Sequence, residues 1–268
     1  TDHDTTAGIA PAQIEGAQNG LEVIPGVEIS SQWPEGILHI LGYFIRQDDP
    51  NLLACLSWLS NGRRERIPLI LDKLRANGVN ITEQDVDEET AGGVPGRPHV
   101  ANVMVRKGYV RTLQDAFDRY LKKGAPAYVV KTKLDPEKAI QAIAKAGGLP
   151  VLAHPYSLRQ SDATKLADIV SQLMAYGLRG IEAYYSKHTR EQTDTYLAVA
   201  SKFGLVVTGG SDFHGANKPD VEMGVIPAAG DLPYRIVENL KSAAKHQPLS
   251  AKMGPLRGSL ASPCGGPA

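Results

Sequence analysis

The feature that most constrains the fold is an alternation of helix and strand patterns, which repeats three times between residues 135 and 208. Each repeat has an amphipathic helical segment, a glycine and then a short apolar run typical of a buried strand. Strands that are separated by helices pair in parallel, because only a crossover returns the chain to the same edge of the sheet. The sequence therefore predicts an α/β fold. The expected helices are residues 135–146, 163–176 and 190–203, and the expected strands are residues 149–153, 180–184 and 205–208.

The first half of the chain is less regular. It predicts a helix at 11–19, a strand at 21–24 that leads into Gly26-Val27-Glu28, and an alternating apolar stretch at 36–44. After residue 48 helical patterns dominate, and no strand alternates with them. We therefore expect an inserted helical subdomain and, at the end, a disordered tail rich in Gly, Pro and Ser. The expected parts are 1–47 and 134–253 for the two portions of the α/β domain, 48–133 for the helical insertion and 254–268 for the tail.

Composition excludes several classes of protein. A chain of 268 residues with 42% apolar side chains can bury one large core and carry an insertion. Lys plus Arg and Asp plus Glu both number 29, so no net charge attracts long duplex DNA or an anionic membrane. No apolar run is long enough for a membrane span, and the first residues do not resemble a signal peptide. Cys55 and Cys264 are expected to be incidental thiols, which indicates a cytoplasmic location.

Six side chains of the kinds that bind Zn, Mn and Fe recur at separated places along the chain. Three of them follow predicted strands, where α/β sheets and barrels place ligands. Taken singly, a histidine beside a strand is more often structural, and an acidic residue there often caps a helix. The whole set favours a polynuclear metal centre, while His99 lies in the insertion and His188 and His246 look exposed. The six candidates are His3, Glu28, His39, His154, Asp212 and His214.

Asp212 and His214 form the most specific pair in this set. Residues two apart in an extended segment point to the same side, with their Cα atoms about 6 to 7 Å apart. They can therefore reach one metal ion or two adjacent ions. Gly209 and Gly210 before them allow a tight turn. A glycine-rich turn whose aspartate merely caps a helix remains the alternative.

Six motifs in order resemble those of the PHP (polymerase and histidinol phosphatase) superfamily. They are Thr-Asp-His-Asp at 1–4, Gly-Val-Glu at 26–28, His-Ile-Leu-Gly-Tyr at 39–43, Gly-Arg-Pro-His at 96–99, Ala-His-Pro at 153–155 and Gly-Ser-Asp-Phe-His at 210–214. The insertion and the fourth motif most resemble the bacterial branch of nucleoside 3',5'-bisphosphate phosphatases and short-RNA 5'-3' exonucleases.

This resemblance implies a distorted (β/α)7 barrel with two or three divalent metal ions, Mn before Fe or Zn. It implies that all six candidates are ligands, with Glu28 as the bridging carboxylate. Family members begin with a strand that carries a His-x-His motif and an Asp shortly after it, and this chain starts too late to contain them. We therefore expect the barrel to lack its first strand here, and the chain itself to bind metal weakly and show little activity.

The resemblance further implies a phosphoesterase in which a metal-activated hydroxide attacks a phosphate monoester. The expected substrate is a nucleoside 3',5'-bisphosphate or the 5' end of short RNA. Arg97 and His99 are candidates for binding phosphate and for protonating the leaving group, and an exposed insertion loop is the alternative. Further candidates for substrate binding are Arg63, Arg66 and Ser157, although a solvated helical face would also explain the two arginines.

Two other functions stay open. One is a phosphatase of a non-nucleotide metabolite such as histidinol phosphate, and the other is a binding domain without catalysis. Stacking on a base would favour the nucleotide, and Tyr128, Tyr156 and Tyr184 are possible platforms. There is no P-loop and no nucleophile elbow, so neither nucleoside triphosphate chemistry nor a serine hydrolase mechanism competes. The sequence does not indicate the oligomeric state.

Overall fold

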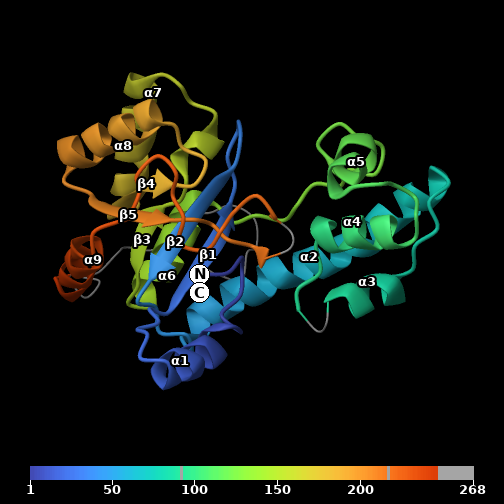
Figure 1. Ribbon diagram of the computed structural model, residues 1–268, viewed down its shortest axis with the longest axis horizontal. Coiled ribbons are helices and arrows are strands. Elements are labelled where there is room, and N and C mark those ends of the chain that lie inside the picture. Colours follow the sequence, from blue (N-terminus) through green and yellow to red (C-terminus); the bar gives the residue numbers. More distant parts are fainter. Residues whose placement is uncertain (91–92, 216–217, 247–268) are drawn as a thin grey trace, which may run out of the picture. The chain divides into compact units, whose positions relative to one another are not determined.

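The computed structural model describes residues 1–90, 93–215 and 218–246. The chain forms two compact units, of which one comprises Thr1–Leu56 with the chain from Lys133 onward, and the other comprises Ser57–Thr132 (Figure 1). We call them the sheet unit and the helical unit. The predicted tail at 254–268 and Cys264 lie outside the described residues. The four-part division and the cytoplasmic location stay predictions.

The sheet unit is built on an open five-stranded mixed sheet in the order β1-β2-β3-β4-β5. β3, β4 and β5 pair in parallel, and the predicted crossover helices α7 (Ala163–Ala175) and α8 (Arg190–Phe203) connect them, so the α/β prediction is confirmed here. β1 pairs antiparallel with β2, and β2 pairs antiparallel with β3. The strands are β1 (Gly26–Ser31), β2 (Leu38–Tyr43), β3 (Leu149–Leu152), β4 (Gly180–Tyr185) and β5 (Val206–Gly210).

Two expectations about this sheet need correction. The expected barrel without its first strand is not formed by the described residues, whose five strands make an open sheet with β1 and β5 at opposite edges. The connection at 32–37 is too short for a crossover, which makes the first pair of strands antiparallel. The strand predicted at 21–24 is also wrong. Pairing starts only at Gly26, after Pro25, which has no N–H to donate to a ladder.

Helices pack on the sheet through faces that the sequence pattern predicts. Asp135 caps α6 by accepting the Glu137 N–H at 2.9 Å, and Ile140 and Ile143 on its apolar face are fully buried. Gly42 of β2 lets α6 approach, because a Cβ there would lie 2.8 Å from a methyl group of Ile143. The helices and turns of this unit are α1 (Ile9–Gln18), α6 (Pro136–Lys145), the 3-10 turn η2 (Pro155–Leu158), α7 (Ala163–Ala175), α8 (Arg190–Phe203) and α9 (Arg235–Lys245) (Figure 1).

The helical unit has its own core and contains no strand among its described residues. Leu74, Val100, Met104 and Leu121 are fully buried in this core. Among the described residues, no helix has the length and apolarity that a membrane crossing requires. The helices are α2 (Pro50–Ala76), which begins in the sheet unit, α3 (Glu83–Thr90), α4 (Arg97–Arg106), α5 (Leu113–Ala116) and the π-helical turn η1 (Phe117–Leu121).

Candidate metal centre

The side chain of Glu28 lies among three imidazoles. Its Oε1 is 2.7 Å from His39 Nδ1 and 3.0 Å from His154 Nε2, and its Oε2 is 3.5 Å from His3 Nδ1. Burial alone would raise the pKa of Glu28, but the imidazoles outweigh it and hold the pKa well below its usual value. The two oxygens thus face different imidazoles. A carboxylate so placed can bridge two metal positions.

Strand register explains how Glu28 and His39 meet. In the β1–β2 pair Glu28 stands opposite Leu41, and Ser30 stands opposite His39. Residues two apart along a strand share a face, so Glu28 and His39 form a diagonal pair on one side of the sheet. The sequence pattern placed Glu28 just after the end of a strand. The structure instead places it inside β1. His154 and Asp212 do follow β3 and β5 as predicted.

Hydrogen bonds around His154 determine which of its ring nitrogens carries a proton. The hydroxyl of Ser157 donates its one proton to the carbonyl of Ile37 at 2.8 Å, so Ser157 Oγ accepts from His154 Nδ1–H at 3.0 Å. A neutral His154 would then direct the lone pair of Nε2 at Glu28 Oε1. That arrangement is repulsive unless a proton or a metal ion lies between the two atoms. Burial acts to lower the pKa of His154, but the bond to Glu28 outweighs it and raises the pKa.

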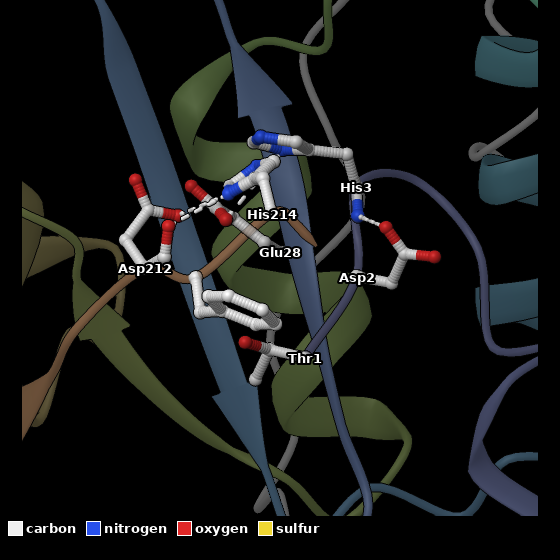
Figure 2. Close-up of a pocket in the computed structure, with 7 residues that line it drawn as sticks. Thr1, Asp2, His3, Glu28, Asp212 and His214 are labelled. Atoms are coloured by element: carbon white, nitrogen blue, oxygen red, sulfur yellow. Dashed lines mark hydrogen bonds and ion pairs between the residues drawn. The ribbon is translucent and has the colours of Figure 1, made fainter. Parts of the chain in front are cut away.

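Asp212 and His214 lie on the same cavity as His3 and Glu28. This cavity has a volume of about 440 Å³, and Figure 2 shows these four side chains around it together with Thr1 and Asp2. His214 Nδ1 donates to the Asp212 backbone carbonyl at 2.7 Å, which leaves Nε2 with its lone pair for a metal. The rings of His3 and His214 have centroids 5.6 Å apart.

The carboxylate of Asp212 has two partners that the sequence did not indicate. Tyr185 donates its hydroxyl to Oδ2 at 2.9 Å, and Lys218 Nζ is 2.5 Å from the same oxygen. Tyr185 in turn stacks on Tyr156, with ring centroids 5.4 Å apart. Only tertiary structure joins these residues, because nothing in the spacing of Tyr185, Asp212 and Lys218 marks them as partners.

The first residues reach Glu28 through backbone pairing. Asp2 C=O accepts the Glu28 N–H at 2.8 Å, and the Asp4 N–H donates to the Glu28 carbonyl at 2.9 Å. The side chain of Asp4 is buried and accepts from the backbone N–H and hydroxyl of Ser30 at 2.8 and 3.0 Å. His3 is thereby set alongside β1 with its ring toward Glu28.

The donor set fits divalent metal ions. His3, Glu28 and His39 each offer a ligand atom, and these atoms lie within 4.8 Å of one another. Imidazole nitrogen and carboxylate oxygen are ligands for Mn, Fe and Zn. The structure thus brings together, in one unit, all six residues that the sequence singled out as candidate ligands. That they bind metal stays a prediction.

The other predicted site residues divide between the two units. Ser157 lies beside His154, whereas Arg63, Arg66, Arg97 and His99 belong to the helical unit. Arg97 Nη1 donates to the Leu121 carbonyl at 2.9 Å, and His99 Nδ1 accepts the Gly96 N–H at 3.0 Å where α4 begins. The second contact closes the first turn of the helix, so Gly-Arg-Pro-His is a helix start and not a free loop.

Arg66 is an unusual buried cation. Its side chain is buried, and neither Nε nor Nη2 has a hydrogen-bond partner among the described residues. Burial, followed by the charges of Arg97 and Arg63, lowers its pKa to about 10. The guanidiniums of Arg66 and Arg97 both lie over the ring of Tyr128, at 6.0 and 5.6 Å from its centroid. Buried donors of this kind normally have an acceptor, and an anion can provide one.

Comparison with known proteins finds relatives that are named as nucleases and phosphoesterases. The chain is 35% identical to a 5'-3' exoribonuclease of Haemophilus influenzae over 80% of this chain and 77% of that protein. It is 31% identical to a 3',5'-nucleoside bisphosphate phosphatase of Chromobacterium violaceum over 84% and 79% of the two chains. A solved structure from Bifidobacterium adolescentis, described as a metal-dependent phosphoesterase, matches with a TM-score of 0.79 at 27% identity. That match covers 90% of this chain and 83% of the other.

The fold matches that of an α/β phosphoesterase, and imidazole and carboxylate groups surround Glu28. No family model matches the chain. The relatives nevertheless show that the chain belongs to the PHP superfamily of phosphoesterases.

Proposed function

We propose that this protein is a metal-dependent phosphoesterase that removes a phosphate from a nucleoside 3',5'-bisphosphate or cleaves at the 5' end of short RNA. The observation that carries the proposal is the contact of Glu28 with the imidazoles of His39 and His154, because carboxylate oxygen and imidazole nitrogen converge in this way around divalent metal ions. The named activities of the two relatives support the substrate class. A small phosphorylated molecule is thus the expected partner.

The residues that would hold two or three divalent ions are His3, Glu28, His39, His154, Asp212 and His214, with Glu28 between two of the positions. Bound ions of this type, Mn before Fe or Zn, stabilise negative charge on a phosphate ester and lower the pKa of water. The chain itself fixes the donor atoms. Ser157 sets the tautomer of His154, and the carbonyl of residue 212 sets that of His214. Lys218 holds the carboxylate of Asp212.

Phosphate binding is proposed for the arginines of the helical unit. Arg66 has two buried donors without a partner among the described residues, and Arg97 lies over Tyr128 beside it. A guanidinium binds two phosphate oxygens at once, so such a group suits the phosphate that is not attacked. We assign Arg63 to the same role, and His99 to proton transfer toward the leaving oxygen. Ser157 remains a predicted substrate contact, although its observed contacts support the positioning of His154.

The direct test is phosphate release by the Mn-loaded protein. Adenosine 3',5'-bisphosphate and a 5'-phosphorylated dinucleotide should be turned over faster than histidinol phosphate. Asp212→Ala and His214→Ala should each lower the amount of Mn bound per chain. A folded, full-length protein loaded with Mn that releases phosphate from none of the three substrates would contradict the proposal. Preference for histidinol phosphate would favour the non-nucleotide alternative.

A separate experiment tests whether the arginines of the helical unit bind phosphate. Arg97→Ala should raise KM while the Mn content stays at the wild-type value. Arg75→Ala is the matched variant, since Arg75 is an exposed arginine of the same unit that pairs with Asp72 at 2.9 Å. It should change neither quantity. Equal effects of the two substitutions would show that general charge, and not a specific phosphate contact, governs substrate binding.

A further inference from the structure

We infer that Glu182 is a positioning residue, whose buried carboxyl holds the backbone of His154 so that the His154 ring faces Glu28. This inference rests on the proposed metal centre and deepens it. Glu182 lies on β4, and its Oε2 accepts the His154 backbone N–H at 2.8 Å. Neither the motifs nor the spacing of the candidate ligands points to this residue.

The need for such a support comes from the backbone of His154. Its φ is +24° and its ψ is 71°, a left-handed region that residues other than glycine seldom adopt. A conformation of this kind costs free energy and persists only where surrounding contacts enforce it. Several such contacts act on His154. Glu182 binds its N–H, Ser157 binds Nδ1, and Glu28 lies against Nε2.

The surroundings of Glu182 are shaped around its carboxyl. The residue is only 5% exposed, so its polar atoms must find partners inside the protein. On the neighbouring strand β5, Gly210 has no Cβ, and a Cβ there would lie 3.1 Å from Glu182 Oε1. A β-bulge between Glu182 and Tyr184 shifts the register of β4 against β5 at this level. The carboxyl thus lies between the ends of the two strands that lead to His154 and Asp212.

This geometry separates a positioning role from a ligand role. The carboxyl of Glu182 binds the main-chain N–H of His154, whereas Glu28 lies against the ring. Groups that orient metal ligands change metal affinity by about 10- to 100-fold when they are removed. The positioning role requires an acceptor oxygen at the end of a side chain that is long enough to reach the His154 N–H. A glutamine keeps both, a methionine keeps the length without the acceptor, and an aspartate keeps the acceptor but draws it back.

The experiment measures Mn²⁺ affinity by calorimetry and the exchange rate of the residue 154 amide by NMR in the same samples. Glu182→Met and Glu182→Asp should each weaken Mn²⁺ binding about 10- to 100-fold and speed the exchange of that amide. Glu182→Gln should keep the wild-type affinity and the slow exchange. Leu173→Ala, a core truncation in α7, controls for loss of stability alone and should leave both readouts unchanged.

The inference is overturned if Glu182→Asp, or Glu182→Met where it folds, binds Mn²⁺ and exchanges its residue 154 amide as the wild type does. Equal losses in Leu173→Ala would also overturn it, because they would reflect stability only. If the wild-type chain binds no Mn²⁺, the proposed function fails. The amide exchange rates still decide the inference in that case, since fast exchange in the aspartate variant and slow exchange in the glutamine variant would support it.

Discussion

His188 shows how strongly a single buried side chain can depart from what its neighbours in the sequence indicate. Polar residues surround it in Ser-Lys-His-Thr-Arg, so we expected it to be exposed, but its side chain is buried against Tyr156, Tyr185 and Tyr196. Nδ1 donates to the Ala183 carbonyl at 2.9 Å, and Nε2 has no hydrogen-bond partner among the described residues. Burial lowers the pKa of His188 to about 4.

This pKa predicts a stability that depends on pH. The unfolded chain takes up a proton at this histidine below pH about 6.5, whereas the folded chain does so only near pH 4. Between these values the unfolded state binds more protons, so the free energy of unfolding falls as the pH falls. From pH 7.5 to pH 5 this one residue should account for about 2 kcal/mol.

Urea unfolding at the two pH values tests this prediction. His188→Gln should lose that part of the pH dependence, whatever its effect on stability at pH 7.5. His246→Gln alters an exposed histidine near the end of α9 and should keep the wild-type dependence. The same pH dependence in wild type and His188→Gln would show that His188 is not held neutral in the folded protein.

At the level of elements, the candidate ligands depend on two loops that support each other. His39 lies in β2, and His154 lies in the turn that follows β3. The segment that leads into β2 contacts this turn. The Ile37 N–H donates to the Ser157 carbonyl at 2.8 Å, and the Ser157 hydroxyl donates back to the Ile37 carbonyl. Gly36 makes this approach possible. Its φ is +74°, and a Cβ at this position would overlap the carbonyl oxygen of Ser157.

Gly36→Ala should therefore destabilise the protein by about 2 to 4 kcal/mol, since the strain of a positive φ adds to that of overpacking. Gly20→Ala is the matched control. Gly20 also has a positive φ, of +68°, but nothing lies within 4 Å of the place that a Cβ would take, so about 1 kcal/mol is expected. Chemical denaturation measures both. Equal losses would mean that the contact between the two loops is not tight.

Sequence patterns predicted the elements whose signal is local. The helix Arg190–Phe203 has both its limits as expected, because the Thr189 side chain caps its start and Gly204 ends it in a left-handed conformation. The antiparallel pairing of β1 with β2 was not predicted, since strand direction depends on the connection and on which edges meet. For the candidate metal centre, the sequence indicated the histidine, aspartate and glutamate residues that could be ligands. The contacts of Glu182, Tyr185 and Lys218 were not, because tertiary packing alone brings them to their partners.

Across the whole molecule, the division into two units predicts that damage to one core stays local. Leu74 is fully buried in the core of the helical unit, and all the buried residues of that core lie between Ile67 and Ala127. The candidate ligands all belong to the sheet unit. The helix α2 runs through both units and carries Pro68 in its interior, where one helical hydrogen bond cannot form.

Leu74→Ala should lower the stability of the helical unit by about 2 to 5 kcal/mol, because a buried leucine leaves a cavity when it is truncated. Hydrogen exchange read by mass spectrometry should show faster exchange in segments of α2 and α4 and unchanged exchange in β1 to β5. The affinity for Mn²⁺ should stay at the wild-type value, while KM rises if the arginines of this unit bind substrate. Loss of Mn²⁺ affinity together with faster exchange in the sheet would instead show that the two units unfold as one.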